Sequence, residues 1–205
     1  SNIRPQTLVS CDRREIKAFI QELGGAAVLK GFQGSSSQAV FLVDEDNRAN
    51  LNQMIDAIAN YGYVIAQEYL PGSARGSVRL FLVNGEPLRY KGKMAAFQWV
   101  RTGDGMRANI PLPGSTEPVQ LTGAHYHIAE AVRPRLVQDG MFLAGRELVD
   151  DKLLDIDVFS PAGLVTAQTF AKVNFSDAVI EALERKVDYM AYYRRRFDNV
   201  DMATL

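Results

Sequence analysis

The 205-residue chain has little of several features that would each point to a class of protein. Cys11 is its only cysteine, so no disulfide can form within the chain, which fits a reducing compartment such as the cytoplasm. Neither sign of charge dominates, since 23 Lys and Arg stand against 24 Asp and Glu, giving a net charge of −1. This balance gives no electrostatic case for a nucleic-acid partner or an anionic membrane.

Long hydrophobic runs and histidines are also scarce. No stretch approaches the roughly 20 apolar residues that a membrane-spanning helix needs, and no signal-peptide pattern is present, so we expect no membrane partner. The two histidines, His125 and His127, are two residues apart on an expected helix. They therefore lie on different faces and cannot easily share a metal ion. The remaining composition, 47% hydrophobic and 23% charged, is that of an ordinary globular protein.

The order of apolar periodicities and turn signals predicts an α+β protein in which hairpins dominate. Asn84-Gly85 between apolar runs is a strong hairpin signal. Residues 101–118 are rich in Gly, Pro and Arg and are expected to form a long loop. Helices are expected over residues 12–23, 47–60, 122–139 and 176–196, and strands over residues 26–30, 39–43, 63–69, 78–83, 87–90 and 92–99.

The most informative stretch is residues 142–163, where two short apolar runs flank a polar turn and predict a hairpin. In the second run, Asp155 and Asp157 alternate with aliphatic residues, so both aspartates point to one face of the strand. A row of carboxylates on a strand that is otherwise suited to burial is costly without a counter-charge. A divalent cation such as Mg²⁺, which takes oxygen ligands, would supply that charge.

A specific register makes the metal hypothesis testable. If Leu148 pairs with Leu154 around an odd-length loop centred near Asp151, then Glu147 pairs with Asp155 and shares their face. The alternative is an edge hairpin that carries acids for solubility. From this segment alone the two interpretations stand about even.

Basic residues elsewhere suggest contacts with anions. Lys30 ends a short strand just before a small-residue loop, where a lysine and backbone N–H groups can together bind phosphate. Arg79 lies within an expected strand, on the same face as Phe81, and an arginine there commonly pairs with a carboxylate or binds an anion. Arg107 and Asn109 lie in the long loop, where ordinary solvated polarity is the simpler interpretation for each alone.

Taken together, these residues resemble the ATP-grasp domain of prokaryotic glutathione synthetase. The resemblance runs from about residue 8 to residue 163 in the family's order. It rests on five segments, V-L-K at residues 28–30, Q-E-Y-L-P at residues 67–71, R-L-F-L-V-N-G-E-P-L at residues 79–88, R-A-N at residues 107–109 and D-D-K-L-L-D-I-D-V-F-S-P at residues 150–161. A collinear set of this kind is far more specific than any one motif.

The resemblance implies an ATP-dependent carboxylate–amine ligase that joins γ-glutamylcysteine to glycine through an acyl-phosphate, with ATP and Mg²⁺ (or Mn²⁺) as cofactors. It implies catalysis by orientation and charge neutralisation, without a covalent enzyme nucleophile. It assigns metal binding to Glu147, Asp155 and Asp157, and nucleotide binding to Lys30, Gly34, Ser35, Ser36, Gln67, Glu68, Tyr69 and Leu70. It assigns catalysis to Arg79 and Arg107, and substrate binding to the same two arginines with Asn109 and Ser160.

The resemblance also implies two ATP-grasp subdomains, a smaller nucleotide lid over residues 1–74 and a larger metal-binding unit over residues 75–205, with ATP between them. The chain departs from the family pattern in several places, among them the lack of an arginine expected near Met94 and Asp150 in place of a turn glycine. The loop after Lys30 carries serines where the family has glycines, Ser77 stands where the family has an aspartate, and Arg146 replaces an apolar residue. Two alternatives therefore stay open, a diverged domain that binds a nucleotide or acidic peptide without ligation, and a ligase for another acid and amine. A homo-oligomer is also left open.

Overall fold

The structure, a computed structural model, describes residues 3–31, 40–101 and 114–204, which fall into two compact units. Unit 2 comprises the described residues within 4–74 and 101–114, and unit 1 comprises residue 3 and the described residues within 75–100 and 115–204. Antiparallel sheets with helices packed on them occur in both units, so the α+β class predicted from the sequence is confirmed.

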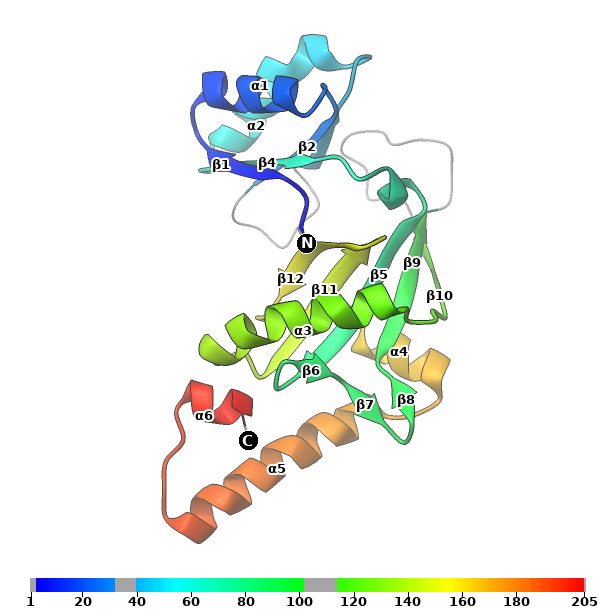
Figure 1. Cartoon of the computed structure of the whole chain (residues 1–205), viewed down its shortest axis with the longest axis vertical. Coiled ribbons are helices and arrows are strands. Elements are labelled where there is room, and N and C mark those ends of the chain that lie inside the picture. The colour runs from blue at the N-terminus through cyan, green and yellow to red at the C-terminus, as the bar shows by residue number, and fades with distance from the viewer. Residues whose placement is uncertain (1–2, 32–39, 102–113, 205) are drawn as a thin grey trace. The chain divides into compact units, whose positions relative to one another are not determined.

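Unit 2 is a four-stranded antiparallel sheet with two helices on one face (Figure 1). In sheet order its strands are β1 (Thr7–Ser10), β4 (Val64–Glu68), β2 (Ala27–Gly31) and β3 (Val40–Val43). Its helices are α1 (Arg13–Glu22) and α2 (Leu51–Ala59), with short 3₁₀ turns at Arg48–Asn50 and Pro71–Ala74. Alternate residues of β2 and β4, among them Leu29 and Ala66, are fully buried against the helices.

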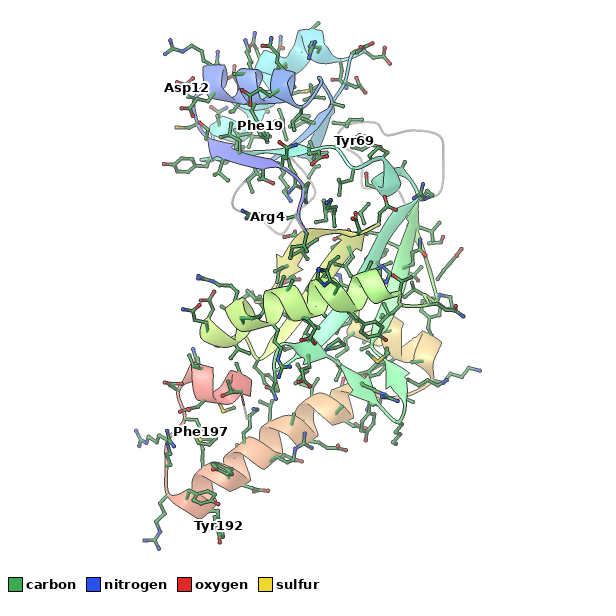
Figure 2. All side chains as sticks on the ribbon, viewed as in Figure 1. Arg4, Asp12, Phe19, Tyr69, Tyr192 and Phe197 are labelled. Atoms are coloured by element: carbon green, nitrogen blue, oxygen red, sulfur yellow. The ribbon has the colours of Figure 1, made fainter. Side chains whose placement is uncertain are left out.

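The first helix begins where its sequence signals predict. The side chain of Asp12 accepts a hydrogen bond from the backbone N–H of Arg14 and so caps α1, at whose start it lies (Figure 2). Ile16 and Ile20, four residues apart, are buried on the face that meets the sheet. Strand β1 was not expected from the sequence, because its four residues carry only a brief apolar signal.

Unit 1 is built on a larger antiparallel sheet. Its main path runs β10 (Gly114–Glu117), β9 (Ala96–Arg101), β5 (Gly76–Val83), β11 (Leu143–Val149) and β12 (Lys152–Asp157), and β6 (Glu86–Pro87) pairs with β5. Strands β7 (Arg89–Tyr90) and β8 (Lys93–Met94) form a separate ribbon. The helices are α3 (Gly123–Gln138), α4 (Leu164–Ala171), α5 (Phe175–Tyr193) and α6 (Asn199–Thr204).

Helices cover both faces of this sheet (Figure 1). Leu80 packs beneath Ile128 of α3 on one face, whereas its neighbour Phe81 packs on the other face with residues of α4 and α5. Because side chains alternate along a strand, Arg79 lies on the same face as Phe81, as the sequence predicted. That face is therefore apolar where α4 and α5 cover it and polar beyond them.

Turn chemistry explains the hairpin at Asn84-Gly85. Both residues have positive φ, 55° and 74°, as a type I′ turn requires, and Val83 pairs with Glu86 across it. Helices α4 and α6 were not expected from the sequence, and β10 lies within an expected loop. Helix α4 begins at Gly163, which has a φ of 97° and lacks the side-chain cap that marks a helix start in a sequence.

Arg146 is the most unusual residue of the fold. It points from β11 toward α3 and is fully buried, and its three guanidinium nitrogens have no hydrogen-bond partner among the described residues. Burial lowers the pKa of Arg146 to about 10, and the charge of Glu130 opposes that shift. Burial lowers the pKa of His125, and the charge of Arg146 lowers it further. No described helix is long and apolar enough to cross a bilayer.

Candidate metal and anion site

A row of charged residues crosses three neighbouring strands of unit 1. Glu147 of β11 pairs with Arg79 of β5 on one side and with Asp155 of β12 on the other. Asp157, two residues further along β12, lies on the same face and is opposite Gly145. We call Arg79, Glu147 and Asp155 the charged row. The pairing of Glu147 with Asp155 confirms the register predicted from the sequence.

The pairing of the leucines next to this row was predicted incorrectly. Leu148 is opposite Leu153 rather than Leu154, and the register shifts between Glu147 and Leu148. The connecting turn is even in length, since Val149 pairs with Lys152. A bulge at this shift supplies the extra residue that was expected to lie in an odd-length loop. As a result, Glu147, Asp155 and Asp157 still lie on one face.

Arg79 is largely buried on this face. Its side chain is 14% exposed, and its Nε has no hydrogen-bond partner among the described residues. A β-carbon added to Gly145 would lie 2.9 Å from Nη1 of Arg79, so the guanidinium occupies the space that the glycine leaves open. A largely buried guanidinium with unused donor capacity is suited to hold a carboxylate or a phosphate.

The carboxylates of Glu147 and Asp155 accept hydrogen bonds from different donors. Oε1 of Glu147 accepts a hydrogen bond from the hydroxyl of Ser77 at 2.5 Å, and Oε2 lies 3.9 Å from Nη2 of Arg79. Oδ1 of Asp155 accepts the backbone N–H of Ile156 at 2.9 Å. Within the part of the chain that the structure describes, no three His, Cys, Asp or Glu side chains are gathered closely enough to hold a metal ion.

The segment after β12 folds back over this face. A β-carbon on Gly145 would lie 2.8 Å from Cβ of Pro161, which places Pro161 beside the guanidinium of Arg79. The backbone N–H of Ser160 donates to Oδ1 of Asp157 at 3.4 Å. Gly163 then lies against the ring of Phe97. The predicted substrate residue Ser160 is therefore next to a predicted metal ligand.

The predicted nucleotide residues that the structure describes lie in unit 2. Lys30 of β2 and Gln67 of β4 point to the sheet face opposite α1 and α2, because Leu29 and Ala66 beside them point into the core. Gln67 is buried and donates to Oγ1 of Thr7 at 3.1 Å.

The three residues that follow Gln67 differ in their surroundings. Leu70 is buried, Tyr69 is half-buried, and Glu68 accepts the backbone N–H of Gln6 at 3.0 Å. Five predicted site residues fall outside the described part of the chain, namely Gly34, Ser35, Ser36, Arg107 and Asn109. Their assignments stay predictions.

Three residues that contact the predicted site residues were not themselves predicted, namely Ser77, Gly145 and Pro161. Ser77 and Gly145 lie two residues before Arg79 and Glu147, and period-two spacing alone would have placed them on the same face. Their contacts are not visible in the sequence, since Ser77 and Glu147 are 70 residues apart.

A cavity of about 350 Å³ lies elsewhere, among α3, α6 and the turn between β5 and β6. Glu86 and Arg133 in its lining form an ion pair at 2.7 Å. It shares no residue with the charged row, so we assign it no role in the chemistry of that row.

A known protein family matches most of the chain. The family model of the prokaryotic glutathione synthetase ATP-grasp domain matches residues 1–172. The glutathione synthetase of Synechococcus elongatus is 36% identical over 91% of this chain and 56% of its own length. That of Vibrio vulnificus is 30% identical over 92% of this chain and 58% of its own length. The chain thus spans a little over half the length of these curated relatives.

Solved ATP-grasp ligases share the fold. The D-cycloserine synthetase DcsG superposes with a TM-score of 0.65 at 16% identity, covering 88% of this chain and 65% of its own. The D-alanine–D-alanine ligase of Bacillus anthracis superposes with a TM-score of 0.60 at 15% identity, covering 87% of this chain and 61% of its own. The ATP-grasp fold predicted from the sequence is confirmed.

Proposed function

The chain belongs to the ATP-grasp domain family of prokaryotic glutathione synthetases, and we propose that its protein is an ATP-dependent ligase that joins γ-glutamylcysteine to glycine. The reaction forms a peptide bond through an acyl-phosphate, and we place it in the cytoplasm. The observation that carries the proposal is the charged row, in which Glu147 lies between Arg79 and Asp155 with Asp157 on the same face.

The donor chemistry of these residues fits Mg²⁺ or Mn²⁺. Glu147, Asp155 and Asp157 offer hard carboxylate oxygens, which these ions prefer. Mg²⁺ is commonly held by one or two carboxylates together with substrate phosphates, so a preformed cluster of three protein ligands is not required. When bound, the metal ion supplies charge that offsets the negative phosphate oxygens. Each aspartate accepts its backbone hydrogen bond through Oδ1, so its second carboxylate oxygen, Oδ2, would be the one offered to the ion.

The chain's own residues bind and orient the anions of the reaction. Arg79 is held over Gly145, and its guanidinium is proposed to bind the carboxylate or phosphoryl oxygens of the substrate. Arg107 and Asn109 are proposed to assist it, and Ser160 is proposed to contact the substrate beside Asp157. Such positioning and charge neutralisation account for catalysis in phosphoryl transfer without a covalent nucleophile.

We assign nucleotide contacts to unit 2. Lys30 and Gln67 share the sheet face that α1 and α2 leave free within that unit, where Lys30 can neutralise phosphate oxygens. The strand end from Gln67 to Leu70 is proposed to line the adenine pocket, partly through its backbone groups. The serines after Lys30 are proposed to donate N–H groups to phosphates.

A thermal-shift experiment tests the metal and nucleotide assignments together. Mg-ATP should raise the melting temperature of the chain, because a ligand that binds only the folded state stabilises it by about 2.7 kcal/mol at a hundredfold excess over Kd. Asp155→Asn should remove this rise. Asp151→Asn, an exposed position in the turn of the same hairpin, should leave the rise unchanged. No shift of the unsubstituted chain at millimolar Mg-ATP would contradict the proposal.

A second candidate is a diverged domain that binds a nucleotide or an acidic peptide without ligation. The observation in its favour is that the described carboxylates are engaged with protein donors and are not gathered. Release of ADP by the full-length protein with γ-glutamylcysteine and glycine separates the two. Sustained turnover would exclude the binding-only function, and turnover with a different pair from a panel of acids and amines would identify another ligase.

A further inference from the structure

The two oxygens of Glu147 are in different environments. Ser77, whose residue exposure is 8%, donates its hydroxyl hydrogen to Oε1 at 2.5 Å. Oε2 accepts no hydrogen bond from the described residues, and its nearest cation, Nη2 of Arg79, lies 3.9 Å away. One oxygen is therefore held by the protein, and the other keeps its lone pairs.

The register indicates the direction in which the second oxygen is available. Ser77 precedes Arg79 by two residues, so it holds Oε1 toward the start of β5. The guanidinium of Arg79 extends the opposite way, over Gly145, which pairs with Asp157. Along the strands, Oε2 therefore lies toward the end of the charged row at which Asp157 pairs with Gly145.

We propose that Ser77 is a positioning residue that fixes the carboxylate of Glu147 so that Oε2 is presented to a divalent cation shared with Asp155 and Asp157. This inference rests on the proposed function, which places the cation at these carboxylates. Residues that hydrogen-bond a metal ligand restrict its orientation, and their loss commonly weakens metal affinity about 10- to 100-fold. Without the hydroxyl, the carboxylate of Glu147 is free to rotate toward the guanidinium of Arg79.

The chain contains a matched control for this contact. Ser10 in unit 2 is buried to a similar degree, 7% exposed, and its hydroxyl donates to Oε2 of Glu15 at 2.6 Å. Ser10→Ala and Ser77→Ala each remove a buried serine hydroxyl from a glutamate carboxylate. Only the second glutamate belongs to the proposed metal site. A purely structural role for Ser77 predicts the same outcome for both variants.

The test is a titration with Mn²⁺, with and without ADP, in which free Mn²⁺ is followed by its electron paramagnetic resonance signal. We expect Ser77→Ala to raise the Kd for Mn²⁺ about tenfold. Ser77→Thr, which keeps the hydroxyl, should restore the Kd of the unsubstituted chain, and Ser10→Ala should not change it. Circular dichroism of each variant verifies that it is folded.

Each other outcome has a definite meaning. If Ser77→Ala binds Mn²⁺ as tightly as the unsubstituted chain, or if Ser10→Ala weakens binding equally, the positioning role is wrong while the metal site stands. If the threonine variant behaves like the alanine variant, the hydroxyl is not the cause and the inference is also wrong. If the unsubstituted chain binds no Mn²⁺ in either condition, the proposed metal site itself fails and the inference fails with it.

Discussion

Gly163 and the ring of Phe97 are so close that no side chain fits between them. A β-carbon on Gly163 would lie 2.7 Å from Cζ and 2.8 Å from Cε1 of Phe97, and the glycine has a φ of 97°. This approach sets the start of α4 against the strand that carries Phe97. It also ends the segment that folds back over the charged row.

Gly163→Ala should destabilise unit 1 strongly. Overpacking costs about 1–3 kcal/mol, and the positive φ adds about 1–2 kcal/mol for a residue with a β-carbon. The free energy of unfolding in urea measures the loss. Gly92→Ala is the matched control, because Gly92 also has a positive φ, 77°, but nothing lies within 4 Å of its added β-carbon. Equal losses in the two variants would show that the contact with Phe97 contributes nothing.

Arg146→Leu should stabilise the protein. The buried guanidinium has no hydrogen-bond partner among the described residues, so the substitution removes a desolvation cost and fills the space with an apolar side chain. Replacing buried charges with apolar residues of similar volume often stabilises by about 1–4 kcal/mol. A higher melting temperature would support this, and a lower one would show that the charge is compensated.

A double-mutant cycle identifies the compensating group. The charge of Glu130 favours the protonated form of Arg146, so Glu130→Gln should destabilise the unsubstituted chain more than it destabilises Arg146→Leu. Arg133→Leu is the control substitution for Arg146→Leu. Arg133 is half-buried, and its ion pair with Glu86 is worth about 0–1 kcal/mol. Identical effects of Glu130→Gln in the two backgrounds would show that Glu130 does not stabilise the charge of Arg146.

His125 should make stability depend on pH. Its Nδ1 accepts the backbone N–H of Thr122 at 3.0 Å, a contact that needs the neutral ring. Burial and then the charge of Arg146 lower the pKa of His125 in the folded state. The unfolded chain therefore binds a proton more readily, so stability is full above the unfolded pKa of about 6.5 and falls as the pH drops below it.

Urea unfolding at about pH 7.5 and about pH 5.5 measures this slope. His125→Gln keeps a side chain that can complete the capping box but cannot titrate, so it should flatten the dependence. Arg146→Leu should reduce the dependence by removing one cause of the shift. His127→Gln is the control at an exposed histidine. A slope that persists in His125→Gln would assign the effect to another group.

Gly145→Ala should impair ligand binding at the site more than its loss of stability explains. Its β-carbon would lie 2.9 Å from Nη1 of Arg79 and 2.8 Å from Cβ of Pro161, so the guanidinium must move. We expect a stability loss of about 1–3 kcal/mol and loss of most of the rise in melting temperature caused by Mg-ATP. Gly123→Ala, with nothing within 4 Å, controls for the substitution itself. A full ligand-induced rise in Gly145→Ala would mean that Arg79 does not contact the ligand.

The sequence predicted those parts of the fold that have strong local signals. Helix α1 has a capping aspartate and apolar residues at helical spacing, and the hairpin at Asn84-Gly85 has the turn residues that its φ values require. Helix α4 has neither kind of signal, because it begins at a left-handed glycine and contains two threonines. The bulge beside Glu147 was also missed, because register reasoning assumes uninterrupted pairing.

The shared face of the acidic residues was predictable from the sequence, but their contacts were not. Alternation along β12 is enough to place Asp155 and Asp157 on one face. The partners of the site depend on pairing between distant segments, as the hydrogen bond from Ser77 to Glu147 shows. Burial of Arg146 under α3 likewise depends on tertiary packing, although the sequence marked it as an unusual residue for that face.

The single tryptophan of the chain makes its fluorescence a selective probe. Trp99 belongs to unit 1, where it packs edge-on against Phe97 at 5.2 Å, and unit 2 has no tryptophan within the 205-residue sequence. Each unit has its own buried core, so the two need not unfold in one transition. Tryptophan emission would then report the melting of unit 1, and a calorimetric transition without a change in emission would be that of unit 2.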